Sequence, residues 1–198
     1  MRENVIVQVL QISLFAIPLV ISPGPNNLLV TANCARFGYR RTLPTLAGIS
    51  LGVIILFMAV ALGLGGLLSH YPALHMALKI LGSAYILYLA YKLYTSQAVG
   101  AENGKNYHPI TLRQAALLQV LNPKIWILAA TATSTFLPLT GAVYTDAILL
   151  SGTLGMIFFP CNSVWAMSGA LMRRLLHDRI FFRLMGGLTA SSAVFLLI

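Results

Sequence analysis

The sequence predicts an all-α membrane protein with six transmembrane helices, arranged as two inverted three-helix repeats in which helices 1 and 4 are interrupted. Three observations support this prediction. Of the 198 residues, 58% are hydrophobic and 9% are charged, whereas soluble domains carry about 25% charged residues. The apolar residues fall into six long runs, with one hydrophilic stretch between the third and the fourth. Proline interrupts the first and the fourth run at equivalent positions.

The six apolar runs are the expected spans, because each reaches or approaches the ~20 residues needed to cross a bilayer core. They lie at 5–32, 43–68, 73–94, 114–138, 144–171 and 180–198. The hydrophilic stretch then separates a first three-helix repeat (1–95), a cytoplasmic linker (96–112) and a second three-helix repeat (113–198). Since each half has an odd number of spans, the second half enters the membrane from the opposite side, and the repeats are expected to be inverted.

Basic residues in the connections predict the orientation. The thirteen Lys and Arg lie mostly between runs one and two, three and four, and five and six, whereas the connections 69–72 and 139–145 contain none. The positive-inside rule therefore places the three basic connections in the cytoplasm and both termini in the periplasm. The net charge of +9 is explained by these clusters, so membrane lipid is the expected surroundings and nucleic acid is not an expected partner.

The first interruption is the strongest candidate for a binding site. Non-helical backbone at membrane depth persists only where it is buried in protein or lines a wet cavity. Pro25 suits the first position of a restarting helix, whose free N–H groups and positive dipole end favour a carboxylate. Unpaired carbonyls around Ile21 and Ser22 would accept hydrogen bonds from an ammonium group. A proline kink, or a loop joining two short spans, remains the alternative. The candidate substrate-binding residues here are Ser22, Pro23, Gly24, Pro25, Asn26 and Asn27.

The second interruption, Asn122-Pro123-Lys124, lies in the fourth run. Paired helix breaks at equivalent positions of two repeats point to a transport site near the midplane. Lys124 is eleven residues from Arg113, or ~16 Å along a helix, and an ionisable group at that depth is functional by default. Lys124 would supply a cation for a carboxylate, and Asn122 an amide that both donates and accepts. The alternative is a misplaced helix boundary that puts Lys124 near the headgroups.

Other residues within the runs have simpler explanations. Asn162, which follows Pro160, is a further candidate for the binding site, although hydrogen bonding between helices is the commoner use. Gly48 and Gly52 form a GxxxG motif for close helix packing, either within one chain or in a homodimer. Cys34 and Cys161 are expected to be small packing residues.

Nothing in the sequence indicates a catalytic residue, a metal site or a cofactor. The four acidic residues and the four histidines lie in connections or at the ends of runs, without metal-ligand spacing. A binding and transport role is therefore favoured, and a membrane-embedded enzyme or an accessory scaffold subunit is the alternative.

Several stretches in sequence order resemble the LysE/RhtB family of bacterial amino-acid exporters. They are 22–27, 35–41, 47–52, 82–92 and 121–124. The resemblance implies a secondary transporter of the bacterial inner membrane that exports small neutral amino acids by alternating access, driven by an ion gradient through antiport. It is nearest the cysteine/O-acetylserine exporter branch, with the homoserine/threonine branch next. Because the residue at membrane depth is basic, Lys124 is the candidate carrier if protons are the coupling ion.

Overall fold

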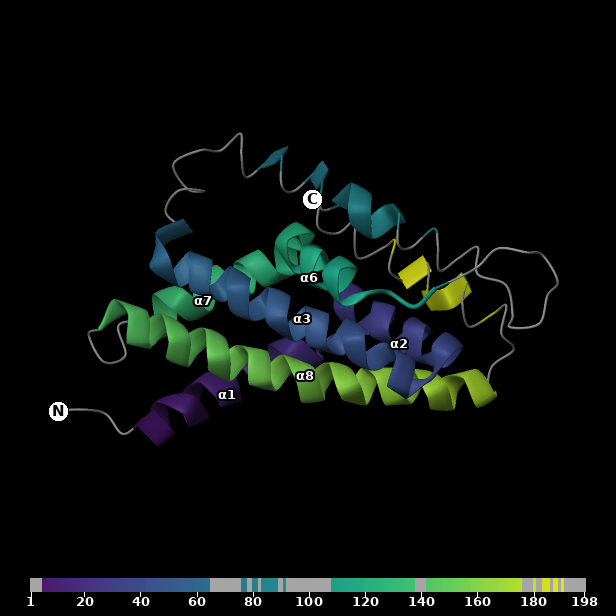
Figure 1. Cartoon of the computed structure of the whole chain (residues 1–198), viewed down its shortest axis with the longest axis horizontal. Helices are drawn as coiled ribbons and strands as arrows, with labels where there is room; N and C mark the ends of the chain where they lie inside the picture. Colours follow the sequence, from purple (N-terminus) through teal and green to yellow (C-terminus); the bar gives the residue numbers. More distant parts are fainter. Residues whose placement is uncertain are drawn as a thin grey trace.

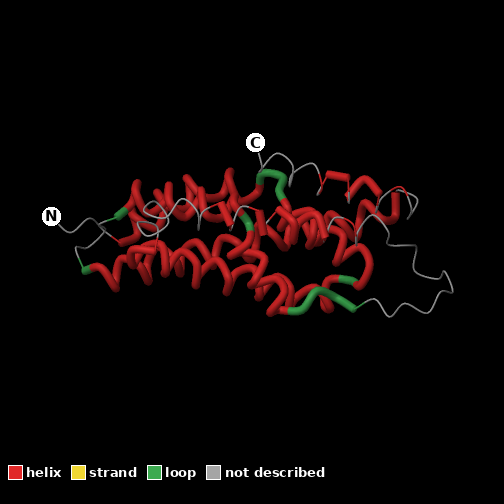
Figure 2. Tube along the Cα trace, turned by 90° about the horizontal axis from the view of Figure 1, so that it is seen from above, coloured by secondary structure: helices red, strands yellow, loops and turns green. Residues whose placement is uncertain are grey.

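The computed structural model describes residues 5–64, 108–137 and 142–175, together with 76–77, 80–81, 83–88, 91, 180, 183–185, 187–188 and 190. Within these residues the regular elements are helices (Figures 1 and 2). Their bounds are α1 Val5–Ile21, α2 Pro25–Phe37, α3 Tyr39–Ala59 with the π-helical turn η1 Val60–Leu64, α6 Leu112–Leu121, α7 Pro123–Phe136 and α8 Val143–Leu175. The all-helical prediction is confirmed for this part of the chain.

Two long helices form the frame of the molecule. Tyr39–Leu64 and Val143–Leu171 are each long and apolar enough to cross a membrane, with mean hydropathies of 2.5 and 1.6. They pack side by side (Figure 1), and Gly155 of α8 leaves no room for a Cβ against the Ile54 side chain of α3. Neither Pro44 in α3 nor Pro160 in α8 interrupts its helix. These two spans support the shorter helices around them.

The other two candidate spans are broken, as the proline positions predict. The axes of α1 and α2 meet at 64° and those of α6 and α7 at 68°, each pair joined by a break of at most four residues. If each bent pair counts as one span, the described residues contain four spans. The expected third and sixth spans and the linker lie largely outside the described residues. The count of six, the division into three segments and the inverted relation therefore stay predictions.

The first basic connection is shorter than the sequence suggested. We expected a loop from 33 to 42, but α2 continues to Phe37 and α3 begins at Tyr39. Gly38 alone joins them, with a φ of 82° that favours glycine and an N–H that donates to the Cys34 carbonyl at 2.8 Å. Hydropathy underestimated both helices because arginine is polar but also a good helix former.

The α2 helix forms the centre of the described structure. Every residue from Pro25 to Ala35 is buried, although several of them are polar. Its neighbours are α8 and α3, whereas α1 exposes apolar side chains such as Ile6 and Leu14. A buried helix with polar side chains must satisfy them internally, and the contacts that do so define the candidate site.

The α6 helix packs against α3 across Gly48 and Gly52. A Cβ on Gly48 would collide with the Leu112 carbonyl, and one on Gly52 would lie 2.7 Å from the Ala116 carbonyl. The two glycines therefore let the backbones of α3 and α6 approach closely within one chain. This contact fixes the helix that precedes the second break.

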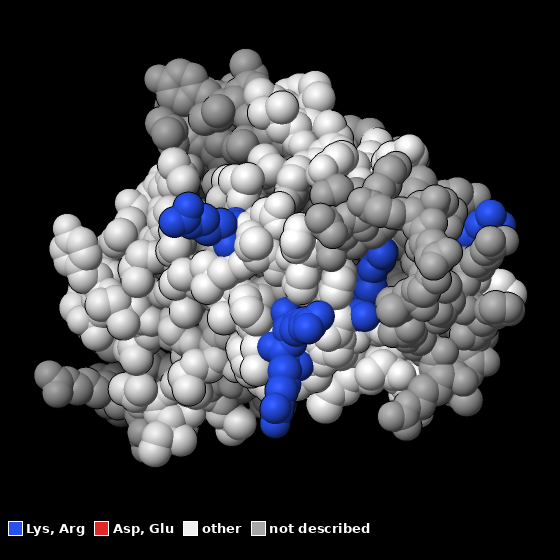
Figure 3. Space-filling view, turned by 45° about the vertical axis from the view of Figure 1, so that its right-hand side comes forward, with Lys and Arg blue, Asp and Glu red and all other residues white. Residues whose placement is uncertain are grey.

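Basic side chains from two separate connections lie at the same end of the molecule. The Ile110 N–H donates to Asn33 Oδ1 at 3.2 Å, and Thr45 Oγ1 donates to the Ile110 carbonyl at 2.6 Å. These bonds hold Arg113 at the end where α2 meets α3. Asp146 is the one acidic residue among those described, and it is 2% exposed. The described surface in Figure 3 accordingly carries basic groups and no visible acidic ones.

Candidate functional site

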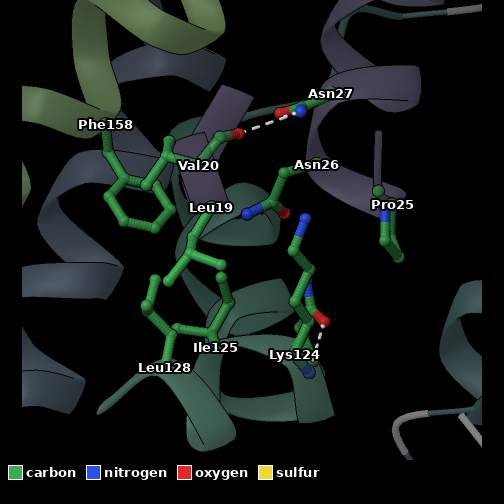
Figure 4. A pocket seen from close by; sticks show the side chains of 11 residues that line it. Leu19, Val20, Pro25, Asn26, Asn27, Lys124, Ile125, Leu128 and Phe158 are labelled. Atoms are coloured by element: carbon green, nitrogen blue, oxygen red, sulfur yellow. Dashed lines mark hydrogen bonds between the residues drawn. The ribbon is translucent and has the colours of Figure 1, made fainter. Parts of the chain in front are cut away.

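The two helix breaks touch each other through Lys124. From the first turn of α7 the Lys124 Nζ donates to three oxygens of the α1–α2 break: Ser22 Oγ at 2.8 Å, the Ser22 carbonyl at 3.1 Å and the Pro23 carbonyl at 3.4 Å. Figure 4 shows the side chain extending toward Pro25 and Asn26 at the start of α2. Residues a hundred positions apart in the sequence are thus joined at one point.

The carbonyls at the end of α1 are all hydrogen-bonded. Asn27 Nδ2 donates to the Val20 carbonyl at 3.0 Å and to the Ser22 carbonyl at 2.7 Å. Trp165 Nε1 donates to the Ile21 carbonyl at 2.9 Å. The expectation of unpaired carbonyls at Ile21 and Ser22 is therefore wrong. A carbonyl without a partner at membrane depth is costly, and the chain supplies its own donors from α2, α7 and α8.

The α8 helix also contacts the first break. In addition to the Trp165 bond, Thr31 Oγ1 donates to the Trp165 carbonyl at 3.0 Å. Gly169 lies against the Thr31 backbone so closely that a Cβ there would collide with it. The sequence contained one sign of this contact. Trp165 places an indole inside an apolar run, and a buried indole N–H usually needs an acceptor.

The start of α2 has free backbone donors. Pro25 occupies the first helical position, and Gly24 caps the helix without a side-chain hydrogen bond. In helix geometry the N–H groups of Asn26 and Asn27 have no intrahelical acceptor. These groups and the positive end of the helix dipole face the region next to Lys124.

The side chain of Asn26 is paired with Gln119, which sequence reasoning missed. Asn26 Nδ2 donates to Gln119 Oε1 at 2.7 Å, and Gln119 Nε2 donates back to Asn26 Oδ1 at 3.2 Å. Gln119 is fully buried and also donates to the Ala115 carbonyl. An amide side chain in the middle of the apolar run of the fourth span was the signal that could have identified it. The pair links α2 to α6.

Asn122 has a buried amide nitrogen that has no partner among the described residues. Its Oδ1 accepts from the Lys124 backbone N–H at 3.1 Å, which caps α7 and fixes the orientation of the amide. The residue is 1% exposed, and Nδ2 donates no hydrogen bond within the described structure. Buried donors are normally satisfied, so this one is available to a ligand.

A small cavity lies between the breaks. Its volume is about 10 Å³, close to the space that one water molecule needs. It is lined by Leu19, Val20, Gly24, Pro25, Asn26, Asn27, Asn122, Lys124, Ile125, Leu128 and Phe158. The lining contains no carboxylate, imidazole or thiol, so it provides charge and hydrogen bonds rather than an acid–base pair. An amino acid fits only after some of these side chains move.

The structure brings most of the sequence-predicted residues together. Six of them line the cavity, Ser22 and Pro23 contact Lys124, and Pro123 begins α7. Asn162 does not line the cavity. It is buried on α8, and its Nδ2 donates to the Phe158 carbonyl one turn earlier at 2.8 Å.

A helical membrane protein whose two broken helices line one small cavity with charged and polar side chains has the arrangement of a secondary transporter. Residues 17–198 match the family described as LysE type translocator, and the chain belongs to this family. The predicted family is thereby confirmed, and the protein is a multi-pass membrane transporter rather than an enzyme.

The chain is similar to several efflux proteins. The chain is 36% identical over 159 residues to the cysteine/O-acetylserine efflux proteins of Escherichia coli (strain K12), Shigella flexneri serotype 5b (strain 8401) and Shigella sonnei (strain Ss046). The alignment covers 80% of this chain and 80% of each relative. No solved structure matches the chain.

Proposed function

We propose that this transporter exports small neutral amino acids across the bacterial inner membrane, from the cytoplasm to the periplasm. Its similarity to cysteine/O-acetylserine efflux proteins supports cysteine and O-acetylserine as the first substrates to test, with homoserine and threonine next. The observation that carries the proposal is the contact between the two breaks, which places hydrogen-bond donors and acceptors around one cavity.

The two ends of the substrate bind to different groups. The carboxylate binds at the N-terminal ends of α2 and α7, where the Asn122 Nδ2 and the backbone N–H groups of Asn26 and Asn27 are available. The ammonium group binds at the oxygens of Ser22 and Pro23. Leu19, Ile125, Leu128 and Phe158 form the apolar part of the lining, which suits a small uncharged side chain.

In this proposal, alternating access depends on the contacts between the helices. Lys124 links α7 to the break between α1 and α2, and Trp165 links α8 to the last residue of α1. The Asn26–Gln119 pair joins α2 to α6. Breaking the Lys124 contacts would allow the α6–α7 pair to move relative to α1, while the other links persist. A proton gradient drives the cycle in this proposal.

Efflux from proteoliposomes tests the function. Vesicles containing the purified chain are loaded with each of the four radiolabelled amino acids, and release is followed with and without a pH gradient. We expect saturable release of at least one of them, accelerated by the gradient. A scaffold subunit would give the same slow leak as empty vesicles for all four, with or without a gradient.

A further inference from the structure

We propose that the Lys124 ammonium occupies the subsite for the substrate's amino group and that the substrate binds by displacing it. The inference rests on the proposed function and adds a rule for selectivity. Lys124 is released only when the entering ligand brings a carboxylate, so the transporter accepts zwitterions and rejects amines and esters.

Lys124 makes the contacts that an α-ammonium group would make. It has three N–H donors, and they meet three uncharged oxygens of Ser22 and Pro23 between 2.8 and 3.4 Å. An amino-acid ammonium carries the same charge and the same number of donors. The side chain therefore forms, within the protein, the interaction expected of the ligand.

The neighbouring acceptors cannot be used in the same way. The Val20 carbonyl is bound by the buried Asn27 of α2, and the Ile21 carbonyl is bound by the half-buried Trp165 of α8. Releasing either would leave an acceptor unpaired at membrane depth. Lys124 has a flexible four-carbon chain, so it is the donor that can withdraw most easily.

The space around Lys124 enforces exchange instead of simultaneous binding. The side chain passes over Gly24, where a Cβ would lie 3.1 Å from Nζ and 3.3 Å from Cδ. The remaining cavity of about 10 Å³ holds roughly one water molecule. A second ammonium group can reach the Ser22 and Pro23 oxygens only after Nζ has left them.

The charge balance explains the selectivity. The Lys124 ammonium lies beside the positive N-terminal ends of α2 and α7. An amine that displaced it would leave two unit charges of the same sign within a few ångströms, which is strongly unfavourable away from water. A zwitterion brings a carboxylate that offsets the displaced charge and bonds to Asn122 Nδ2.

Competition with methyl esters tests the exchange. The competing ligands are the amino acid that the wild-type chain transports and its methyl ester, which keeps the ammonium group but lacks the carboxylate. Inhibition of labelled efflux is measured for the wild type, for Lys124→Met and for the surface control Arg113→Met. In Lys124→Met we expect the affinity of the ester, relative to that of the zwitterion, to rise at least about tenfold, because the repelling charge is gone. The control should keep the wild-type ratio.

The possible results separate the two proposals. If the wild type transports none of the four amino acids, the proposed function fails and the inference fails with it. The other negative result is that the wild type transports but Lys124→Met binds the zwitterion more weakly without binding the ester more tightly. Lys124 then binds only carboxylates, and the proposed exchange is wrong. Lys124→Gln is measured in parallel in case the methionine variant does not fold, and Lys124→Arg should retain rejection of the ester.

Discussion

The two helix breaks have opposite chemistry, although both place a proline at the start of the second helix. At the first break the carbonyl oxygens of Val20, Ile21, Ser22 and Pro23 are all bound by side chains from other segments. At the second, Asn122 caps the following helix by itself and keeps one amide donor unused. At the first break the end of α1 is thus a set of acceptors, whereas at the second Asn122 supplies a donor.

This difference suggests how a pair of related breaks can bind a zwitterion. Two identical breaks would each present the same mixture of groups. Here the ammonium and the carboxylate have separate partners. Lys124 connects the two breaks directly, and the Asn26–Gln119 pair joins α2 to α6 beside it. Substitutions at the acceptor break, at the donor break and at the contacts between them can therefore be compared.

The largest effect is expected for Asn122→Asp. Aspartate keeps the oxygen that accepts from the Lys124 N–H, so α7 remains capped. It replaces the unused donor with an acceptor that repels a carboxylate. Loss of one hydrogen bond to a charged group corresponds to about 1.5–3 kcal/mol, or roughly a 10- to 150-fold rise in KM for efflux. Asn122→Ser, which keeps an N-cap without the negative charge, should lose less. An unchanged KM in the aspartate variant would show that Asn122 does not bind the substrate.

The second prediction concerns the packing that supports the donor side. Gly48→Ala would push a Cβ into the Leu112 carbonyl at the start of α6. Overpacking of this kind costs about 1–3 kcal/mol, so the midpoint of thermal unfolding in detergent should fall. Gly152→Ala is the matched control, because a Cβ there meets nothing within 4 Å. Equal unfolding midpoints for the two variants would show that α3 and α6 are not in close contact.

A smaller effect is expected on the acceptor side. Trp165→Phe keeps an aromatic ring but removes the donor to the Ile21 carbonyl. An acceptor left unpaired costs about 1–3 kcal/mol, and partial exposure of Ile21 favours the lower end. Thermal unfolding should show a modest loss of stability, and efflux should persist with a reduced rate. Unchanged stability would mean that the indole N–H does not cap α1.

The sequence predicted the breaks much better than it predicted their partners. Pro23, Pro25 and Pro123 lack backbone donors, and their equivalent places in the first and fourth apolar runs indicated the interruptions, whereas Pro44 and Pro160 lie inside continuous helices. The contacts of Trp165 and Gln119 depend on which helices become neighbours in space, and one sequence does not contain that information. Gly38 shows the same limit, since hydropathy separated α2 from α3 by ten residues where one suffices.

The last prediction tests the Asn26–Gln119 pair, the contact between α2 and α6 that does not involve Lys124. Asn26→Leu or Gln119→Leu alone leaves a buried amide partly unpaired, at a cost of about 1–3 kcal/mol. The double variant Asn26→Leu, Gln119→Leu removes both amides and should be closer to the wild type in thermal stability than the sum of the single changes. The measurement is a double-mutant cycle in detergent. Strict additivity would show that the reciprocal bonds between α2 and α6 contribute nothing to stability, and that the breaks are held together by Lys124 and packing alone.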